Sequence, residues 1–351
     1  MNNQLVRRSV AGLTLAALAA VGLAAVPSPA RAAVDEAQLG GQYDLYSWNC
    51  AGTADGDDLD AVPWSDDNVP VTKSTSASAT FTGSEGDVVQ ATSSTSTSIT
   101  ASPLGSGPAT ITGSATASAS ALASGSTTAC DVRSQAQSQA MGVFTLTQPM
   151  WATLTAAGQG QRQGQAQGAS FVGVGNIDGF GSSWEGYFGL GGDGLVVSAG
   201  NRGSAVSSTL LPAGTYGVAF ASIAYAVASD EGDGSASYTG TFTVDLKPVG
   251  SASAATGKGA SLVRFGERDC ASGDVSVVLG KKTVRKAKRV AFKVDGAKAA
   301  VLKGKKLEGR KPKARTVTLP TTATGVTKVK VKIVLANGRR MQATRSYLPC
   351  R

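Results

Sequence analysis

Polar and apolar positions alternate with a period of two along much of the chain, which is the pattern of half-buried β-strands. The clearest case is PATITGSATASASAL at 108–122, where from 110 to 120 one face carries only Thr and Ser and the other carries Ile111 and small residues. STSASATFTG (74–83) and STSTSITAS (94–102) repeat the pattern. No sustained helical periodicity follows the first thirty-odd residues. The alternation predicts an all-β protein made of two β-sandwich domains.

The C-terminal strands are expected at 274–280, 289–297, 315–320 and 328–350. In the last segment apolar residues alternate with lysines, so the lysines should point outward about 6.6 Å apart. Asn337-Gly338 marks a turn with two open registers. A two-residue loop would place Arg340 beside Leu335, and a three-residue loop would pair Met341 with Ile333. The second register buries Met341 and is favoured.

Charge separates the two predicted domains. The chain has a formal net charge of +9, but residues 33–250 hold 5 basic and 19 acidic residues, and 251–351 hold 25 basic and 5 acidic residues. The change falls near GSASAATGKGAS, whose composition is typical of a linker. We therefore expect an acidic β-sandwich at 33–250, a linker at 251–260 and a basic β-sandwich at 261–351.

The N-terminus predicts export. Arg7 and Arg8 precede an apolar run of about fifteen residues, too short to span a membrane, and Ala30-Arg31-Ala32 completes an A-x-A cleavage pattern. We expect residues 1–32 to be a signal peptide and the mature protein to be secreted, extracellular or cell-wall associated. The Ala-rich signal and the Ala/Gly/Ser/Thr-rich body resemble exported actinobacterial proteins in composition.

The four cysteines agree with an oxidising compartment. Cys50, Cys130, Cys270 and Cys350 form no C-x-x-C motif, which disfavours a zinc site. Three pairings are open. The domain division favours Cys50–Cys130 and Cys270–Cys350, each closing a loop of about 80 residues.

Enzymatic function has little support in the sequence. The chain has no histidine, which excludes Ser-His-Asp triads and H-E-x-x-H zinc sites, and no phosphate-binding P-loop is found. A carboxylate-pair hydrolase needs only two acids at the right separation, but no pair stands out. We expect a non-catalytic protein without a cofactor; the alternative is a polysaccharide-acting hydrolase or a glycan-binding accessory protein that uses the acidic sandwich.

Two features of the acidic domain could bind ligands. The first is an acidic loop that could hold Ca²⁺ through Asp55, Asp57, Asp58 and Asp60, although Leu59 and Asp60 break the EF-hand pattern. Its alternative is a solvated loop or a partner for the basic domain. The second is a Gly-rich aromatic segment, which either fills the core or forms a glycan platform through Trp184, Tyr187 and Phe188.

The basic domain is the main candidate for binding. Segment 281–315 holds fifteen Lys or Arg and two acids. Three roles are open for such a surface. It is a solvated face, it docks on the acidic domain of the same chain, or it binds an anionic cell-wall polymer or another extracellular polyanion. Lysine outnumbers arginine, which suits diffuse attraction better than bidentate recognition. Sequence-specific binding of nucleic acid is not expected, because the sequence shows no helix to enter a groove and few aromatic residues to stack on bases. The candidate residues are Lys281, Lys282, Arg285, Lys286, Lys288, Arg289, Lys305, Lys306, Lys328, Lys330 and Lys332.

Two family resemblances follow from these residues. The turn LPAGTY (211–216), between an apolar strand and a long following strand, resembles secreted bacterial jelly-roll accessory modules of the pre-peptidase C-terminal type over residues 140–247. This resemblance implies a usually non-catalytic module, some members of which bind glycans or calcium. The strands of the basic domain resemble a small immunoglobulin-like sandwich, but without its core Trp and with a bridge expected at its ends.

Overall fold

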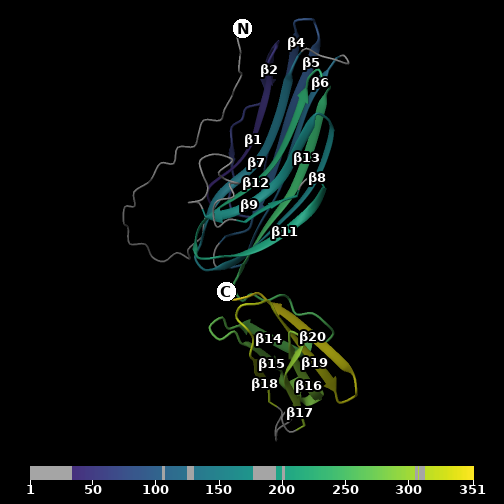
Figure 1. Ribbon diagram of the computed structural model, residues 1–351. Helices are drawn as coiled ribbons and strands as arrows, with labels where there is room; N and C mark the ends of the chain where they lie inside the picture. The colour runs from purple at the N-terminus through teal and green to yellow at the C-terminus, as the bar shows by residue number, and fades with distance from the viewer. Residues whose placement is uncertain are drawn as a thin grey trace, which may run out of the picture. The chain divides into compact units, whose positions relative to one another are not determined.

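The computed structural model describes residues 34–104, 107–124, 130–176, 195–199, 202–304, 307 and 313–351. The chain divides into two compact units, Met1–Leu246 and Lys247–Arg351, and Figure 1 shows the strands that build each of them. The prediction of two all-β sandwiches is confirmed. The expected signal peptide lies outside the described residues. None of the helices in the described ranges is long and apolar enough to cross a membrane.

The N-terminal unit packs a six-stranded sheet against a seven-stranded sheet. The first has the order β10 (Leu195–Ser198), β9 (Ala166–Asn176), β12 (Gly214–Ala228), β7 (Val132–Leu146), β1 (Val34–Ser47) and β3 (Val62–Pro63). The second has the order β11 (Arg202–Leu211), β8 (Met150–Gly164), β13 (Gly234–Pro248), β6 (Ala109–Ala123), β5 (Val88–Ala101), β4 (Val71–Gly83) and β2 (Cys50–Gly56). The three alternating segments of the sequence are β6, β4 and β5.

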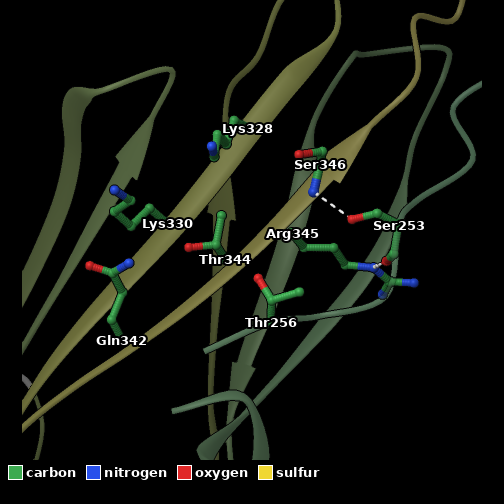
Figure 2. A pocket seen from close by; sticks show the side chains of 8 residues that line it. All are labelled: Ser253, Thr256, Lys328, Lys330, Gln342, Thr344, Arg345 and Ser346. Atoms are coloured by element: carbon green, nitrogen blue, oxygen red, sulfur yellow. Dashed lines mark hydrogen bonds between the residues drawn. The ribbon is translucent and has the colours of Figure 1, made fainter. Parts of the chain in front are cut away.

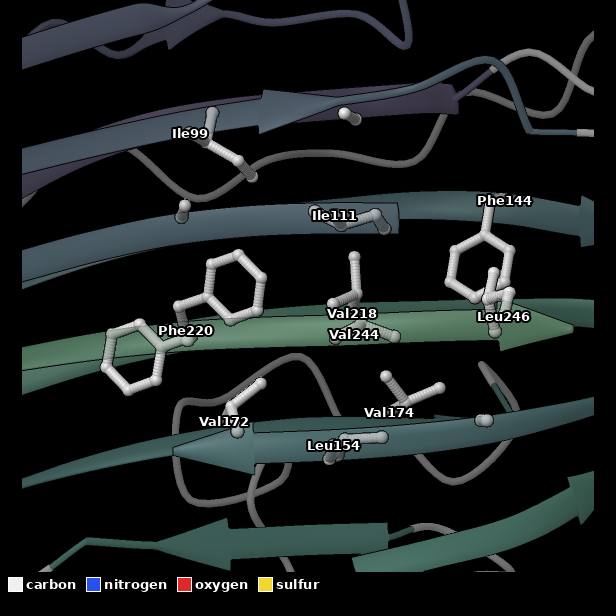
Figure 3. Packing of buried hydrophobic residues seen from close by; sticks show 14 of the residues in the cluster. Ile99, Ile111, Phe144, Leu154, Val172, Val174, Val218, Phe220, Val244 and Leu246 are labelled. Carbon is white, nitrogen blue, oxygen red and sulfur yellow. The ribbon is translucent and has the colours of Figure 1, made fainter. Parts of the chain in front are cut away.

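One part of this sandwich has a conventional apolar core. Ile99 and Ile111 come from the seven-stranded sheet, and Val218 and Phe220 face them from the six-stranded sheet (Figure 3). Phe220 stacks on Phe242 with 5.3 Å between ring centroids and 7° between ring planes. Burial of these large side chains supplies the main apolar contact between the two sheets.

Elsewhere the interior is made of small residues and hydroxyl groups. The hydroxyls of Ser134, Ser138 and Ser222 on the six-stranded sheet donate to backbone carbonyls of the facing sheet, at 2.7, 2.9 and 2.8 Å. A serine side chain is too short to bridge sheets at the usual spacing of about 10 Å. The two sheets therefore approach closely here, which alanine, serine and glycine permit and larger side chains would prevent.

A disulfide and several chain crossings join the sheets of this unit. The predicted Cys50–Cys130 bridge is confirmed, with Cα atoms 5.6 Å apart. It ties β2, at the edge of the seven-stranded sheet, to the residue that shortly precedes β7 in the six-stranded sheet. The LPAGTY turn also carries the chain between sheets, from β11 to β12, and the hydroxyl of Tyr216 closes it by donating to the carbonyl of Pro212 at 2.9 Å.

The C-terminal unit is a seven-stranded sandwich around a Val-rich core. Its three-stranded sheet has the order β14 (Val263–Arg268), β15 (Val275–Leu279) and β18 (Arg315–Leu319). Its four-stranded sheet has the order β17 (Ala297–Lys303), β16 (Ala287–Val294), β19 (Thr327–Leu335) and β20 (Arg340–Tyr347). The four expected strand segments are found, and Ile333 pairs with Met341 across the three-residue loop that the sequence favours.

Several elements of this unit were not expected. β14 precedes Cys270, so this cysteine does not lie before the first strand. A short helix, α2 (Lys281–Lys286), and a 3-10 turn, η2 (Ala260–Leu262), interrupt a unit in which no helix was expected. The Cys270–Cys350 bridge is nevertheless confirmed, with Cα atoms 5.3 Å apart. It joins the β14–β15 connection to the segment after β20.

The segment 251–260 does not have the structure of a free linker. The backbone amides of Ser253, Thr256 and Gly259 donate to carbonyls of Ser346, Thr344 and Gln342 at 2.8–2.9 Å, along the edge of β20. Its small residues suit this close backbone contact as well as they suit a flexible connection. Composition alone could not distinguish the two arrangements.

Candidate anion-binding surface

The four-stranded sheet of the C-terminal unit separates apolar and cationic side chains onto its two faces. Val290, Phe292, Val329, Val331 and Ile333 are fully buried in the core. On β19 the positions between the buried residues carry Lys330 and Lys332 and point outward. On β16, Ala291 lies between Val290 and Phe292, and the outward positions before and after it carry Arg289 and Lys293. This confirms the prediction that the valine face turns inward and the lysine face outward, and it follows from the two-residue period of β16 and β19.

Strand register places several of these cations directly opposite one another. Lys293 on β16 lies opposite Lys298 on β17 and Lys330 on β19, and Arg289 lies opposite Lys303. Adjacent strands are about 4.8 Å apart. Like charges that face each other across neighbouring strands are destabilising. The arrangement therefore opposes folding stability and calls for a functional explanation.

The outward face forms a broad groove of ≈ 1490 Å³. Its walls come from β16, β17, β19, β20 and the segment before η2. No acidic residue is among the described residues that line it. Eight lining residues are cationic: Lys258, Lys288, Arg289, Lys293, Lys298, Lys303, Lys332 and Arg340. We refer to this set as the cationic groove.

A smaller concavity of ≈ 280 Å³ lies on the same sheet, toward the other ends of β19 and β20. Figure 2 shows Lys328 and Lys330 on β19 beside Gln342 and Thr344 on β20. The guanidinium of Arg345 is held in place, because it donates to the carbonyls of Ser253 and Phe265 at 2.8 and 3.0 Å. The lysines, amide and hydroxyl here extend the polar, positively charged face of the sheet.

One arginine of this unit is structural. Arg268 is 6% exposed, and its guanidinium donates to the carbonyls of Gly325 and Leu348 at 3.0 and 2.6 Å and to the hydroxyl of Thr327 at 3.1 Å. Burial lowers the pKa of Arg268 below its ordinary value. Its charge satisfies loop carbonyls and does not contribute to the outer face.

The structure gathers only part of the predicted anion-binding set. Lys288, Arg289 and Lys332 line the cationic groove, and Lys328 and Lys330 line the neighbouring concavity. Four residues are exposed on α2 but line neither site: Lys281, Lys282, Arg285 and Lys286. Lys305 and Lys306 lie outside the described residues.

Sequence reasoning missed five residues of the groove. Lys293 continues the alternation of β16, and Lys298 and Lys303 lie on β17, a strand that was not predicted. Lys258 was assigned to a linker, and Arg340 belongs to the hairpin whose register was open. The alternation around Val290 and Phe292 was sufficient to find Lys293, but the other four depend on strand pairing.

In the acidic loop, local hydrogen bonds engage two of the four candidate calcium ligands. The carboxylate of Asp57 accepts hydrogen bonds from the hydroxyl and amide of Ser76 at 2.8 and 2.7 Å, and these bonds lower its pKa. A carboxylate oxygen of Asp58 accepts from the amide of Asp60 at 3.2 Å, and Asp55 pairs in β2 with Ser78. Within the described ranges, no three acidic, His or Cys residues are grouped to hold a metal. Calcium binding by this loop stays a prediction.

Trp184, Tyr187 and Phe188, the residues of the predicted glycan platform, lie outside the described residues. A polar concavity of the N-terminal unit lies elsewhere, on the outer face of its seven-stranded sheet.

Comparison with known proteins adds little to this geometry. No protein-family model matches the chain, and no curated protein matches it. The adhesin domain of Epf from Streptococcus pyogenes matches with a TM-score of 0.16 and 10% sequence identity, over 70% of this chain and 76% of that one. A TM-score this low does not show a shared fold. The resemblances to pre-peptidase C-terminal modules and to immunoglobulin-like domains therefore stay predictions.

Proposed function

We propose that this is a secreted, non-catalytic binding or structural protein of the cell envelope, whose C-terminal unit binds anionic wall polymers through the cationic groove. The observation that carries the proposal is the row of like charges that strand register places side by side on one sheet face. A linear polyanion that lies across this row would replace repulsion between the lysines with attraction to each of them.

The chemistry of the groove favours a flexible polyanion over a single small anion. Six of its eight cations are lysines, whose compact ammonium groups attract phosphate or carboxylate as point charges without fixed geometry. The cations are spread over four strands, so several charges of one chain can be engaged together. Release of counterions from such a polymer makes its binding strongly dependent on salt.

The test compares two variants with equal loss of charge. In the groove variant, Lys293, Lys298 and Lys332 are all replaced by Gln; in the control variant, Lys281, Lys282 and Arg285 on α2 are replaced by Gln. Binding of the full chain to polyglycerol phosphate is measured by titration between 50 and 500 mM NaCl. We expect the groove variant to bind at least about tenfold more weakly and its log–log salt slope to fall by about 2–3.

The control should stay within about threefold of the wild type, since its charges lie outside the groove. Equal losses in both variants would mean that net charge, and not the groove, causes binding. Retention of the wild-type protein on isolated walls in about 0.5 M NaCl would refute electrostatic retention altogether.

A further inference from the structure

The outer face of the seven-stranded sheet carries an array of hydroxyl groups. Register places Ser237, Ser118, Ser94 and Ser76 in one row across β13, β6, β5 and β4. The neighbouring rows also consist of Ser and Thr: Ser235, Ser120, Thr92 and Ser78, and Thr239, Thr116, Ser96 and Ser74. The strands that a row crosses are about 4.8 Å apart, and successive rows are about 6.7 Å apart.

One end of this array is hollowed into a concavity of ≈ 890 Å³. Its floor is formed by hydroxyl residues, including Ser118 and Ser237. Gln161, Arg162 and Arg202 line it as well, from the end of β8 and the start of β11. This size suits a ligand of a few hundred daltons, because pockets for such ligands measure about 300–1,000 Å³.

The floor retains hydrogen-bonding capacity after its internal pairing. The hydroxyls of Ser118 and Ser237 pair at 2.8 Å, and those of Thr92 and Ser120 pair at 2.7 Å. Each pair has two O–H protons and uses one between its members, so each pair keeps a donor and several lone pairs. The hydroxyls of a sugar are likewise both donors and acceptors, and the floor can pair with them in either direction.

The charges around the concavity differ from those of the unit that holds it. Residues 33–250 contain only five basic residues, and two of them, Arg162 and Arg202, line this one site. Both are exposed, and no acidic residue is among the described residues of the lining. A guanidinium presents a planar fork of donors that matches a carboxylate.

We propose that this concavity binds a short oligosaccharide that carries one or two carboxylates, with the sugar hydroxyls on the serine and threonine floor and the carboxylates at Arg162 and Arg202. Residues 33–250 hold 19 acidic residues against 5 basic ones, so an extended polyanion would be repelled beyond the concavity. The proposed ligand is therefore short. This site is independent of the cationic groove and of the function proposed for it.

The probe is digalacturonic acid, which carries two carboxylates, with its fully methyl-esterified form as the uncharged match. The titrations use the full chain in which Lys293, Lys298 and Lys332 are replaced by Gln, which weakens binding at the cationic groove. We expect R162Q/R202Q to weaken binding of the acid at least about tenfold, because two charge-assisted contacts are lost. K73Q/K247Q removes the same charge from this part of the chain, outside the concavity, and should change binding less than about twofold.

Tryptophan fluorescence reports whether each variant keeps the N-terminal unit folded, since all four Trp residues lie in residues 33–250. The proposal is overturned if the methyl ester binds as tightly as the acid, or if K73Q/K247Q loses as much affinity as R162Q/R202Q. It is also overturned if the acid does not bind at millimolar concentration to the folded protein.

Discussion

The close approach of the two sheets in the N-terminal unit depends on buried hydroxyls, and Ser138→Ala tests this directly. Ser138 is fully buried. Its hydroxyl donates to the carbonyl of Ser96 at 2.9 Å and lies 2.5 Å from the hydroxyl of Thr97. Without Ser138, the hydroxyl of Thr97 keeps only a long contact of 3.4 Å to the carbonyl of Gly40.

The magnitude follows from the groups that the substitution leaves without partners. A buried polar group that loses its partner costs about 1–3 kcal/mol, whereas an exposed side-chain hydrogen bond contributes little because water replaces it. Ser208→Ala is the matched control, since its hydroxyl pairs with Thr153 at 2.9 Å on an exposed surface. We expect S138A to destabilise the unit by about 1–3 kcal/mol and S208A to change stability by less than ~0.5 kcal/mol.

Urea unfolding of the oxidised protein, followed by tryptophan fluorescence, measures both variants. The signal reports on the N-terminal unit alone, because residues 247–351 contain no Trp. Ser138→Val provides a second check: a larger side chain should destabilise the unit at least as much as alanine, since it must fit between sheets that are already close. Equal effects of S138A and S208A, or a stabilising S138V, would refute the hydroxyl-bridged interior.

Three further outcomes are expected in the C-terminal unit. Replacing Cys270 and Cys350 together by Ser should lower the unfolding free energy of this unit by about 4–5 kcal/mol, because the unfolded chain gains entropy when the loop is opened. Urea unfolding followed by circular dichroism measures the change, and an unchanged midpoint would contradict the expectation. Gly250→Ala should destabilise the same unit, because Gly250 has φ +71° and an added Cβ would lie 2.7 Å from the Sγ of Cys270. Thermal melts of the variant measure this loss of stability. Burial raises the pKa of Tyr347 from 10.0 to about 12. Its contribution to stability is therefore complete below pH 10 and lost as the pH rises toward 12, and Tyr347→Phe should flatten this pH dependence in melts of the unit.

The candidate site shows where sequence reasoning succeeds and where it fails. Lys328, Lys330 and Lys332 could be assigned to an outer face because the valines and isoleucine between them have only one favourable direction, the core. The pairing of Lys293 with Lys298 and Lys330 could not be predicted, because it depends on which strands pair and on a bulge in β17, where the register shifts opposite Phe292 and Lys293. Clustering of Asp residues in the sequence likewise says nothing about competing hydrogen bonds, such as those from Ser76 to Asp57.

Alternation in the sequence was enough to locate several strands, such as β4, β5, β6 and β19, and composition alone established the separation of charge, because both are local properties. The sequence favoured the disulfide pairing that the structure contains, but β14 and β17 were not predicted from it. On β5, Val89, Ala91, Ile99 and Ala101 mark the buried face, and Ser93, Thr95 and Thr97 lie on the same face and are buried as well. The partners of these buried hydroxyls, such as Ser138 for Thr97, were decided only by the tertiary structure, because they depend on how closely two distant sheets pack.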